Sequence, residues 1–265
     1  MMGAIAGDII GSVYEFNAIK HKDFPLFTHK SAFTDDTILS VAIAEAILEK
    51  GDYGKTIKRY AQNYPNPVGS YGARFQQWAA SSSLAPYNSW GNGSAMRVSA
   101  VGFAYDDMHT VLKVAKRTAE VTHNHLEGIK GAQATAAAIF LAKRGSRKSA
   151  IKDFVESEFG YDLGRSLKEI RPTYSFNESC QQTVPESIIA FLESTDFEDA
   201  IRNAISLGGD TDTMGSITGG IAEAYYGGVP DEIVQEVLVR LDEPLKHMTL
   251  RFCDRYTQPY PLFSA

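Results

Sequence analysis

The first residues read Met1-Met2-Gly3-Ala4-Ile5-Ala6-Gly7-Asp8-Ile9-Ile10-Gly11, an apolar run with one aspartate and a glycine at every fourth position. This spacing places Gly3, Gly7 and Gly11 on one face of a helix, where a second backbone can approach closely. The segment lacks the cationic start of a signal peptide, and Asp8 interrupts its apolar run. We therefore predict that it forms a helix buried inside the protein.

Helical periodicity extends over most of the chain, whereas the alternating pattern of β-strands is scarce. The repeat of apolar residues predicts helices at about 36–49, 111–121, 131–142, 150–159, 185–193, 197–206, 214–226 and 231–241. The Ala-rich composition of 131–142 predicts tight packing between neighbouring helices. The longest irregular stretch is expected at about 64–94, and long loops of this kind are usually functional. Since no linker or internal repeat divides the chain, we predict a single all-α domain over residues 1–265.

Composition excludes several classes of protein. The chain is 44% apolar and 22% charged, which is typical of a globular protein and not of a disordered one. A formal net charge of −6 argues against a protein that mainly coats nucleic acid. Two isolated cysteines, Cys180 and Cys253, do not make a disulfide framework. No apolar run reaches the roughly 20 residues that span a bilayer, so we expect a cytoplasmic protein without a membrane anchor.

Two short acidic segments each precede an apolar helical pattern, Thr34-Asp35-Asp36-Thr37 and Gly208-Gly209-Asp210-Thr211-Asp212-Thr213. Either segment alone is explained by helix capping, because Thr and Asp satisfy the free N–H groups of a first turn. If both helix starts converge, however, their carboxylates repel one another unless a cation is bound. Oxygen ligands favour Mg²⁺, Mn²⁺ or Ca²⁺ over zinc, and two such ions can orient and activate a water.

These segments belong to an ordered set of motifs that resembles the ADP-ribosylglycohydrolase family. The set comprises Gly11-Ser12-Val13-Tyr14-Glu15, Thr34-Asp35-Asp36-Thr37, Gly91-Asn92-Gly93-Ser94-Ala95-Met96-Arg97, Thr122-His123-Asn124-His125 and Gly208-Gly209-Asp210-Thr211-Asp212-Thr213. The resemblance implies a compact orthogonal helical fold with a dinuclear magnesium or manganese centre. It also implies hydrolysis of the glycosidic bond at C1″ of ADP-ribose.

The resemblance assigns expected roles to individual residues. The expected ligands of the two divalent cations, Mg²⁺ or Mn²⁺, are Thr34, Asp35, Asp36, Asp210, Asp212 and Thr213. Glu15 is expected to transfer protons, with Asp35 or Asp36 assisting the water. The expected substrate-binding residues are Gly72, Ser89, Trp90, Gly91, Asn92, Gly93, Ser94 and His123. For the Gly-rich loop, backbone N–H groups would bind the diphosphate.

Other readings stay open from the sequence. The chain could be a catalytically silent ADP-ribose-binding or structural member of the family, although its intact Asp pairs argue against this. An unrelated metal-dependent phosphohydrolase would explain the acids but would leave Glu15 and the Gly-Asn-Gly loop without a role. For an active enzyme we expect an ADP-ribosylated protein as the substrate. Arginine is the first acceptor that we expect, with serine or an O-acetyl group as alternatives. We also expect that the protein does not bind nucleic acid directly and that it is a monomer.

Overall fold

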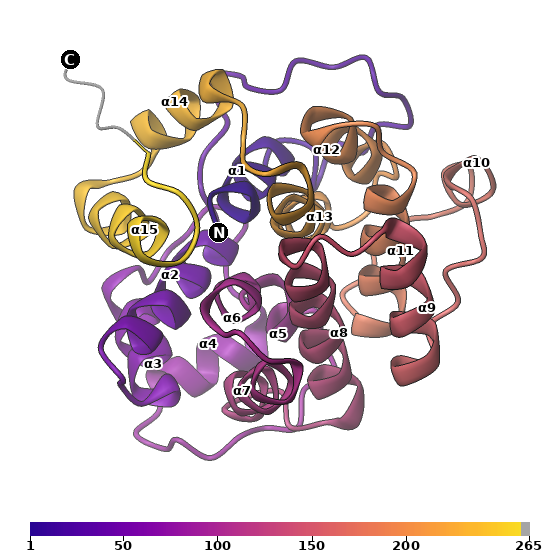
Figure 1. Ribbon diagram of the computed structural model, residues 1–265. Coiled ribbons are helices and arrows are strands. Elements are labelled where there is room, and N and C mark those ends of the chain that lie inside the picture. Colours follow the sequence, from indigo (N-terminus) through magenta and orange to yellow (C-terminus); the bar gives the residue numbers. More distant parts are fainter. Residues whose placement is uncertain (261–265) are drawn as a thin grey trace.

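Helices make up almost all of the regular structure in the computed structural model, which describes residues 1–260 (Figure 1). In chain order they are α1 (Met2–Gly11), α2 (Asp35–Leu48), α3 (Tyr53–Asn63), α4 (Ala73–Ala80), α5 (Gly93–Met96), α6 (Ser99–Ala104), α7 (Met108–Glu120), α8 (Leu126–Lys143), α9 (Lys148–Phe159), α10 (Leu167–Ile170), α11 (Cys180–Leu192), α12 (Phe197–Ile205), α13 (Thr211–Tyr226), α14 (Asp231–Arg240) and α15 (Glu243–Tyr256). Extended segments within residues 1–260 form isolated bridges and no sheet. The prediction of an all-α fold is confirmed.

Helices α1 and α13 lie side by side in the middle of the molecule (Figure 1). A Cβ on Gly7 would lie 1.9 Å from the carbonyl oxygen of Gly215, and a Cβ on Gly3 would lie 2.3 Å from that of Gly219. No side chain fits between backbones at these distances. Every residue of α1 is buried, so the predicted role of the glycine stripe is confirmed.

The Ala-rich helix α8 is buried against several neighbours, including α5, α6, α7, α11 and α13. Its small side chains let these helices approach closely. A Cβ on Gly102 of α6, for example, would lie 2.6 Å from the side chain of Ile139, and a Cβ on Gly131 would lie 2.4 Å from the Cys180 sulfur. The buried apolar side chains of the described residues form one continuous core, as the predicted tight packing requires.

The structure differs from the predicted elements in several places, and helices α3, α6, α10 and α15 lie in no predicted range. Helix α4 lies inside the stretch that we expected to be irregular, since Phe75, Trp78 and Ala79 bury one face of a short helix. The surrounding Pro, Gly and Ser residues hide the helical repeat of these apolar residues. Helix α11 begins before the predicted start, so that Pro185 lies inside it. In the described part of the chain, no helix is long and apolar enough to cross a membrane.

Candidate active site

A pocket of about 440 Å³ opens where the first residues of α2 and α13 face the loop before α5. This volume lies within the usual range for sites that bind small molecules. Most of the residues expected to act at the site line this pocket: Glu15, Asp35, Asp36, Gly72, Ser89, Trp90, Gly91, Asn92, Gly93, His123, Asp210, Asp212 and Thr213. The two acidic segments, far apart in the sequence, therefore converge as the sequence led us to expect.

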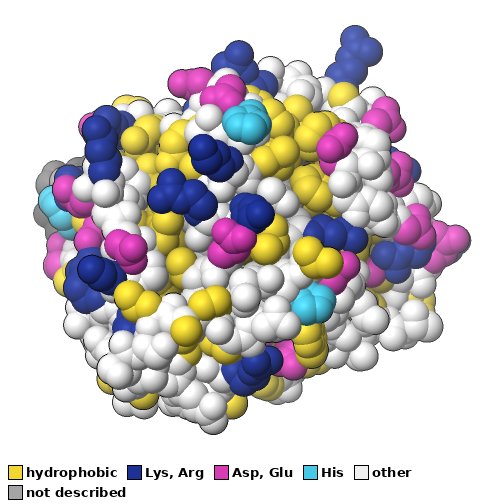
Figure 2. Space-filling view, turned by 90° about the horizontal axis from the view of Figure 1, so that it is seen from below, with side chains coloured by type: hydrophobic (Ala, Val, Ile, Leu, Met, Phe, Trp, Pro, Cys, Tyr) yellow, Lys and Arg dark blue, Asp and Glu magenta, His cyan; other side chains and the backbone are white. Residues whose placement is uncertain are grey.

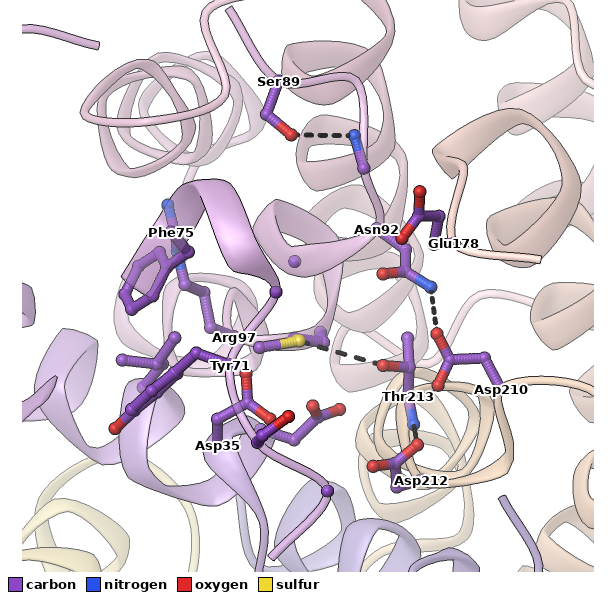
Figure 3. A pocket seen from close by; sticks show the side chains of 18 of the residues that line it. Asp35, Tyr71, Phe75, Ser89, Asn92, Arg97, Glu178, Asp210, Asp212 and Thr213 are labelled. Atoms are coloured by element: carbon purple, nitrogen blue, oxygen red, sulfur yellow. Dashed lines mark hydrogen bonds between the residues drawn. The ribbon is translucent and has the colours of Figure 1, made fainter. Parts of the chain in front are cut away.

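Carboxylates from three parts of the chain face a common space on one side of the pocket (Figure 3). Asp35 projects from the start of α2, and Asp210 and Asp212 lie at the start of α13. Single carboxylate oxygens of Glu15, Asp210 and Asp212 lie within 4.8 Å of one another. Oxygen atoms at this spacing can share one metal ion.

Burial and mutual repulsion disfavour the charged forms of these carboxylates. Burial raises the pKa values of Asp35, Asp36 and Asp210 well above the ordinary range, and the charge of Asp212 adds to the effect. Burial also raises the pKa of Glu15 to about 8, again with the repulsion of Asp212 as the next cause. A positive ion would relieve both effects, because it replaces the lost solvation and separates the like charges.

Two carboxylate oxygens in this group of acids have no hydrogen-bond partner in the part of the chain that the structure describes, as expected if the group binds a cation. Oε2 of Glu15 and Oδ2 of Asp36 are buried and have no hydrogen-bond partner among the described residues. Buried carboxylate oxygens normally have a hydrogen-bond partner or a bound cation, so these two oxygens indicate a site for a bound partner. The donor set contains only oxygen, which suits a hard divalent cation such as Mg²⁺ or Mn²⁺. The residues therefore fit the expected metal, whereas their individual roles as ligands stay predictions.

Asp8 is an important residue of this region that the sequence analysis read only as a break in an apolar run. It lies inside α1, is fully buried, and accepts hydrogen bonds from the backbone N–H of Thr34 at 3.0 Å and of Thr37 at 3.1 Å. Both threonine hydroxyls also donate to it. Asp8 thus ties the start of α2 to α1, which is itself packed directly on α13. The sequence feature that could have predicted this role is a single acid within a helix that is otherwise apolar and buried.

Two of the expected site residues do not line the pocket within residues 1–260. Thr34 is the N-cap of α2: its hydroxyl donates to Asp8 at 2.7 Å and accepts from the backbone N–H of Asp36. Ser94 is buried beneath the Gly-rich loop, where its hydroxyl donates to the carbonyl of Gly128 at 2.6 Å. In the described structure both hydroxyls therefore hold the framework of the site together.

Hydrogen bonds within the chain shape the Gly-rich loop. The N–H of Gly91 donates to the Ser89 hydroxyl at 3.1 Å, and the N–H of Asn92 donates to the carbonyl of Glu178 at 2.7 Å. These two groups are therefore engaged, although we expected the loop N–H groups to face a diphosphate. The Asn92 side chain donates to Asp210 at 2.7 Å and so orients an acid of the carboxylate group (Figure 3).

Aromatic side chains line another part of the pocket, next to Asp35 (Figure 3). Tyr71 and Phe75 stack at a centroid distance of 5.1 Å, and both line the pocket (Figure 3). At the rim, Phe16, Trp90 and Phe176 are large apolar side chains left exposed. Sequence analysis missed Phe176 and the neighbouring Glu178, because they lie in a non-periodic segment that reaches the pocket only through tertiary contacts. A flat ring bound here would find aromatic partners.

Comparison with known proteins agrees with this geometry. The sequence model of the family described as ADP-ribosylglycohydrolase matches residues 1–261. The chain is 28% identical to ADP-ribosylhydrolase ARH3 of Bos taurus, over 86% of this chain and 84% of the relative. It is 24% identical to the ADP-ribosylarginine hydrolase Tri1 of Pseudomonas putida, over 89% of this chain and 72% of the relative. A solved structure described as an "ADP-ribosylglycohydrolase-related protein complex" superposes with a TM-score of 0.71 at 25% identity and covers 96% of both chains.

Proposed function

The chain belongs to the ADP-ribosylglycohydrolase family, a family of ADP-ribosyl hydrolases, and from this premise we propose that it removes ADP-ribose from a modified acceptor by hydrolysis at C1″. One observation carries the proposal. Acids from the turn after α1, the start of α2 and the start of α13 meet in a single pocket that also contains the Gly-rich loop. A silent family member would not need to keep this costly group of buried carboxylates.

The acidic side of the pocket is the proposed metal centre. Asp35, Asp36, Asp210 and Asp212, with the hydroxyl of Thr213, would hold two Mg²⁺ or Mn²⁺ ions, whereas the Thr34 hydroxyl is already bonded to Asp8. When bound, such ions supply the positive charge that lowers the pKa of a water and stabilises charge in the transition state. Asn92 holds Asp210 through its 2.7 Å hydrogen bond, and Asp8 holds the start of α2. These contacts keep the acids oriented.

Glu15 is the proposed proton donor. Its raised pKa, about 8, results first from burial and then from the charges of Asp212 and Asp8. Bound cations would lower this pKa, so the proposed role as proton donor rests on the place of Glu15 in the pocket, beside Asp210 and Asp212. Hydrolysis then breaks the bond from C1″ to the acceptor, which takes the proton of Glu15, and adds the hydroxyl of water to C1″, while the proton released by the water returns to Glu15. Asp35 or Asp36 would orient that water.

The rest of the pocket would bind the ADP part of the substrate. The Gly-rich loop and His123 face the diphosphate in this proposal, and the aromatic side chains contact the ring systems. Arginine is the first acceptor that we propose, since a guanidinium suits an acidic and aromatic pocket. On the face drawn in Figure 2, basic and acidic side chains are interspersed, without an extended basic band. The formal net charge of −6 supports a modified protein over nucleic acid as the substrate.

A panel of substrates tests the proposal. The purified protein is incubated in Mg²⁺ or Mn²⁺ with arginine-linked, serine-linked, nucleobase-linked and O-acetyl-linked ADP-ribose, and free ADP-ribose is quantified. We expect release from at least one substrate, with the arginine-linked one fastest. Release from none of them, by a folded protein that contains metal, would contradict the proposal.

A further inference from the structure

Arg97 is a buried cation that no carboxylate of the described residues contacts. It follows α5, is fully buried, and takes part in no ion pair within residues 1–260. Its Nη2 donates to the carbonyl of Thr118 at 3.1 Å and to the hydroxyl of Thr122 at 2.8 Å, at the carboxyl end of α7. The guanidinium is favourably placed there, because the carboxyl end of a helix attracts positive charge.

The direction of the contact with Thr122 is fixed, since an arginine can only donate. The Thr122 hydroxyl therefore accepts from Arg97 and keeps its own hydrogen for another partner. Among the described residues this oxygen also lies 2.7 Å from Nδ1 of His123, and the Tyr87 hydroxyl lies near it. Thr122 is fully buried, so a proton on Nδ1 would leave the Tyr87 hydroxyl as the acceptor for the Thr122 hydrogen, in place of the 2.7 Å contact to Nδ1. This arrangement favours a deprotonated Nδ1 that accepts from Thr122.

The other nitrogen of His123 faces the Gly-rich loop. A Cβ on Gly93 would lie 3.1 Å from His123 Nε2, and a Cβ on Gly91 would lie 3.6 Å from it. The ring lines the pocket, and Nε2 makes no hydrogen bond to a described residue. Burial, together with the charges of Arg97 and Arg74, holds the pKa of His123 well below its ordinary range. The ring is thus neutral, with one N–H to place.

We propose that Arg97 and Thr122 are positioning residues that fix the tautomer of His123, so that Nε2–H faces the Gly-rich loop as a permanent donor to a phosphate oxygen. The inference rests on the proposed function for the identity of the anion, whereas the tautomer itself follows from the hydrogen bonds. His123 then serves as a neutral hydrogen-bond donor and does not exchange protons with the substrate. The buried positive charge of Arg97 acts in the same direction, because it disfavours an imidazolium on His123 beside it.

Nitrogen-15 NMR of histidine-labelled protein tests the tautomer without any ligand. We expect wild-type His123 to be neutral with its proton on Nε2, Thr122→Ser to keep that state, and Thr122→Val to lose it. A wild-type imidazolium, or a neutral ring with its proton on Nδ1, would overturn the proposal even if the enzyme released ADP-ribose. The wild-type spectrum alone decides this point, so the test does not depend on whether a variant folds.

Calorimetry with ADP-ribose in Mg²⁺ tests the donor role. Loss of a hydrogen bond to a charged group predicts affinity about 10–100-fold weaker for Thr122→Val, with Thr122→Ser close to wild type. Binding of adenosine, which has no phosphate, should be equal in both variants. Full ADP-ribose affinity in a folded Thr122→Val protein with the altered tautomer would overturn the donor role. Absence of ADP-ribose binding by wild type would instead contradict the proposed function and the donor role together, leaving the NMR result to decide the tautomer.

Discussion

Replacing Gly7 by alanine should separate α1, which carries Asp8, from α13, which carries Asp212. The new Cβ would lie 1.9 Å from the carbonyl oxygen of Gly215, and ordinary van der Waals contact begins at 3.4 Å, so α1 and α13 must move apart by about 1.5 Å. The obstacle is backbone, which no rotamer change can relieve. We expect a loss of about 3 kcal/mol or more in the free energy of unfolding, the upper end of overpacking penalties.

Thermal denaturation measures this loss, and calorimetry measures its effect on the site. For a protein of this size, about 3 kcal/mol corresponds to a Tm lowered by roughly 6–12 °C. Mn²⁺ affinity should fall as well, because Asp8 follows Gly7 and Asp212 lies on the displaced helix. Gly51→Ala is the matched control, since its Cβ would meet nothing closer than 3.6 Å. A Gly7→Ala protein with the Tm and Mn²⁺ affinity of the control would refute the reasoning.

Three further predictions concern the acids. Asp8→Ala leaves the donors of Thr34 and Thr37 unpaired, so the Mg²⁺-loaded protein should lose about 2–4 kcal/mol in denaturant unfolding, and an unchanged midpoint would contradict the anchoring role. Asn92→Ala removes the support of Asp210 and should weaken Mn²⁺ binding about 10–100-fold in calorimetry, with an unchanged affinity as the contrary result. In EDTA, the folded-state pKa values of Asp8, about 7, and Glu15, about 8, exceed their unfolded values of 3.8 and 4.5. The folded state then binds more protons, so Tm should fall as pH rises from about 5 to about 8, and a rise would contradict the shifts.

Local patterns were enough to predict the helices that matter most for this fold. The glycine spacing of Gly3, Gly7 and Gly11 indicated a close backbone contact, and the structure identifies α13 as the partner. The paired acidic segments implied a cation only if their helix starts converge, the family resemblance supplied that expectation, and the pocket shows the convergence. Sequence reasoning could not place Glu15 beside them without the family resemblance, since one acid at a helix end is ordinary.

Residues that act through tertiary contacts were harder to predict. Asp8 accepts hydrogen bonds from a segment more than 20 positions away, and no periodic pattern marks such a contact. Helix α4 was hidden because its short apolar face lies between Pro-, Gly- and Ser-rich segments. Phe176 reaches the pocket because the chain before α11 is bridged to Gly91. Each of these features depends on where two distant segments meet, which composition and spacing do not encode.

Metal-dependent release of ADP-ribose tests the central claim most directly. Wild-type protein is stripped with EDTA, Mg²⁺ or Mn²⁺ is titrated back, and ADP-ribose release from the best substrate of the panel is followed, with Asp212→Asn as the matched variant. We predict no release from the stripped protein, recovery that saturates with metal, and no recovery in the variant. Release that persists in EDTA, or that Asp212→Asn retains at the wild-type rate, would contradict a metal-dependent hydrolase built on these carboxylates.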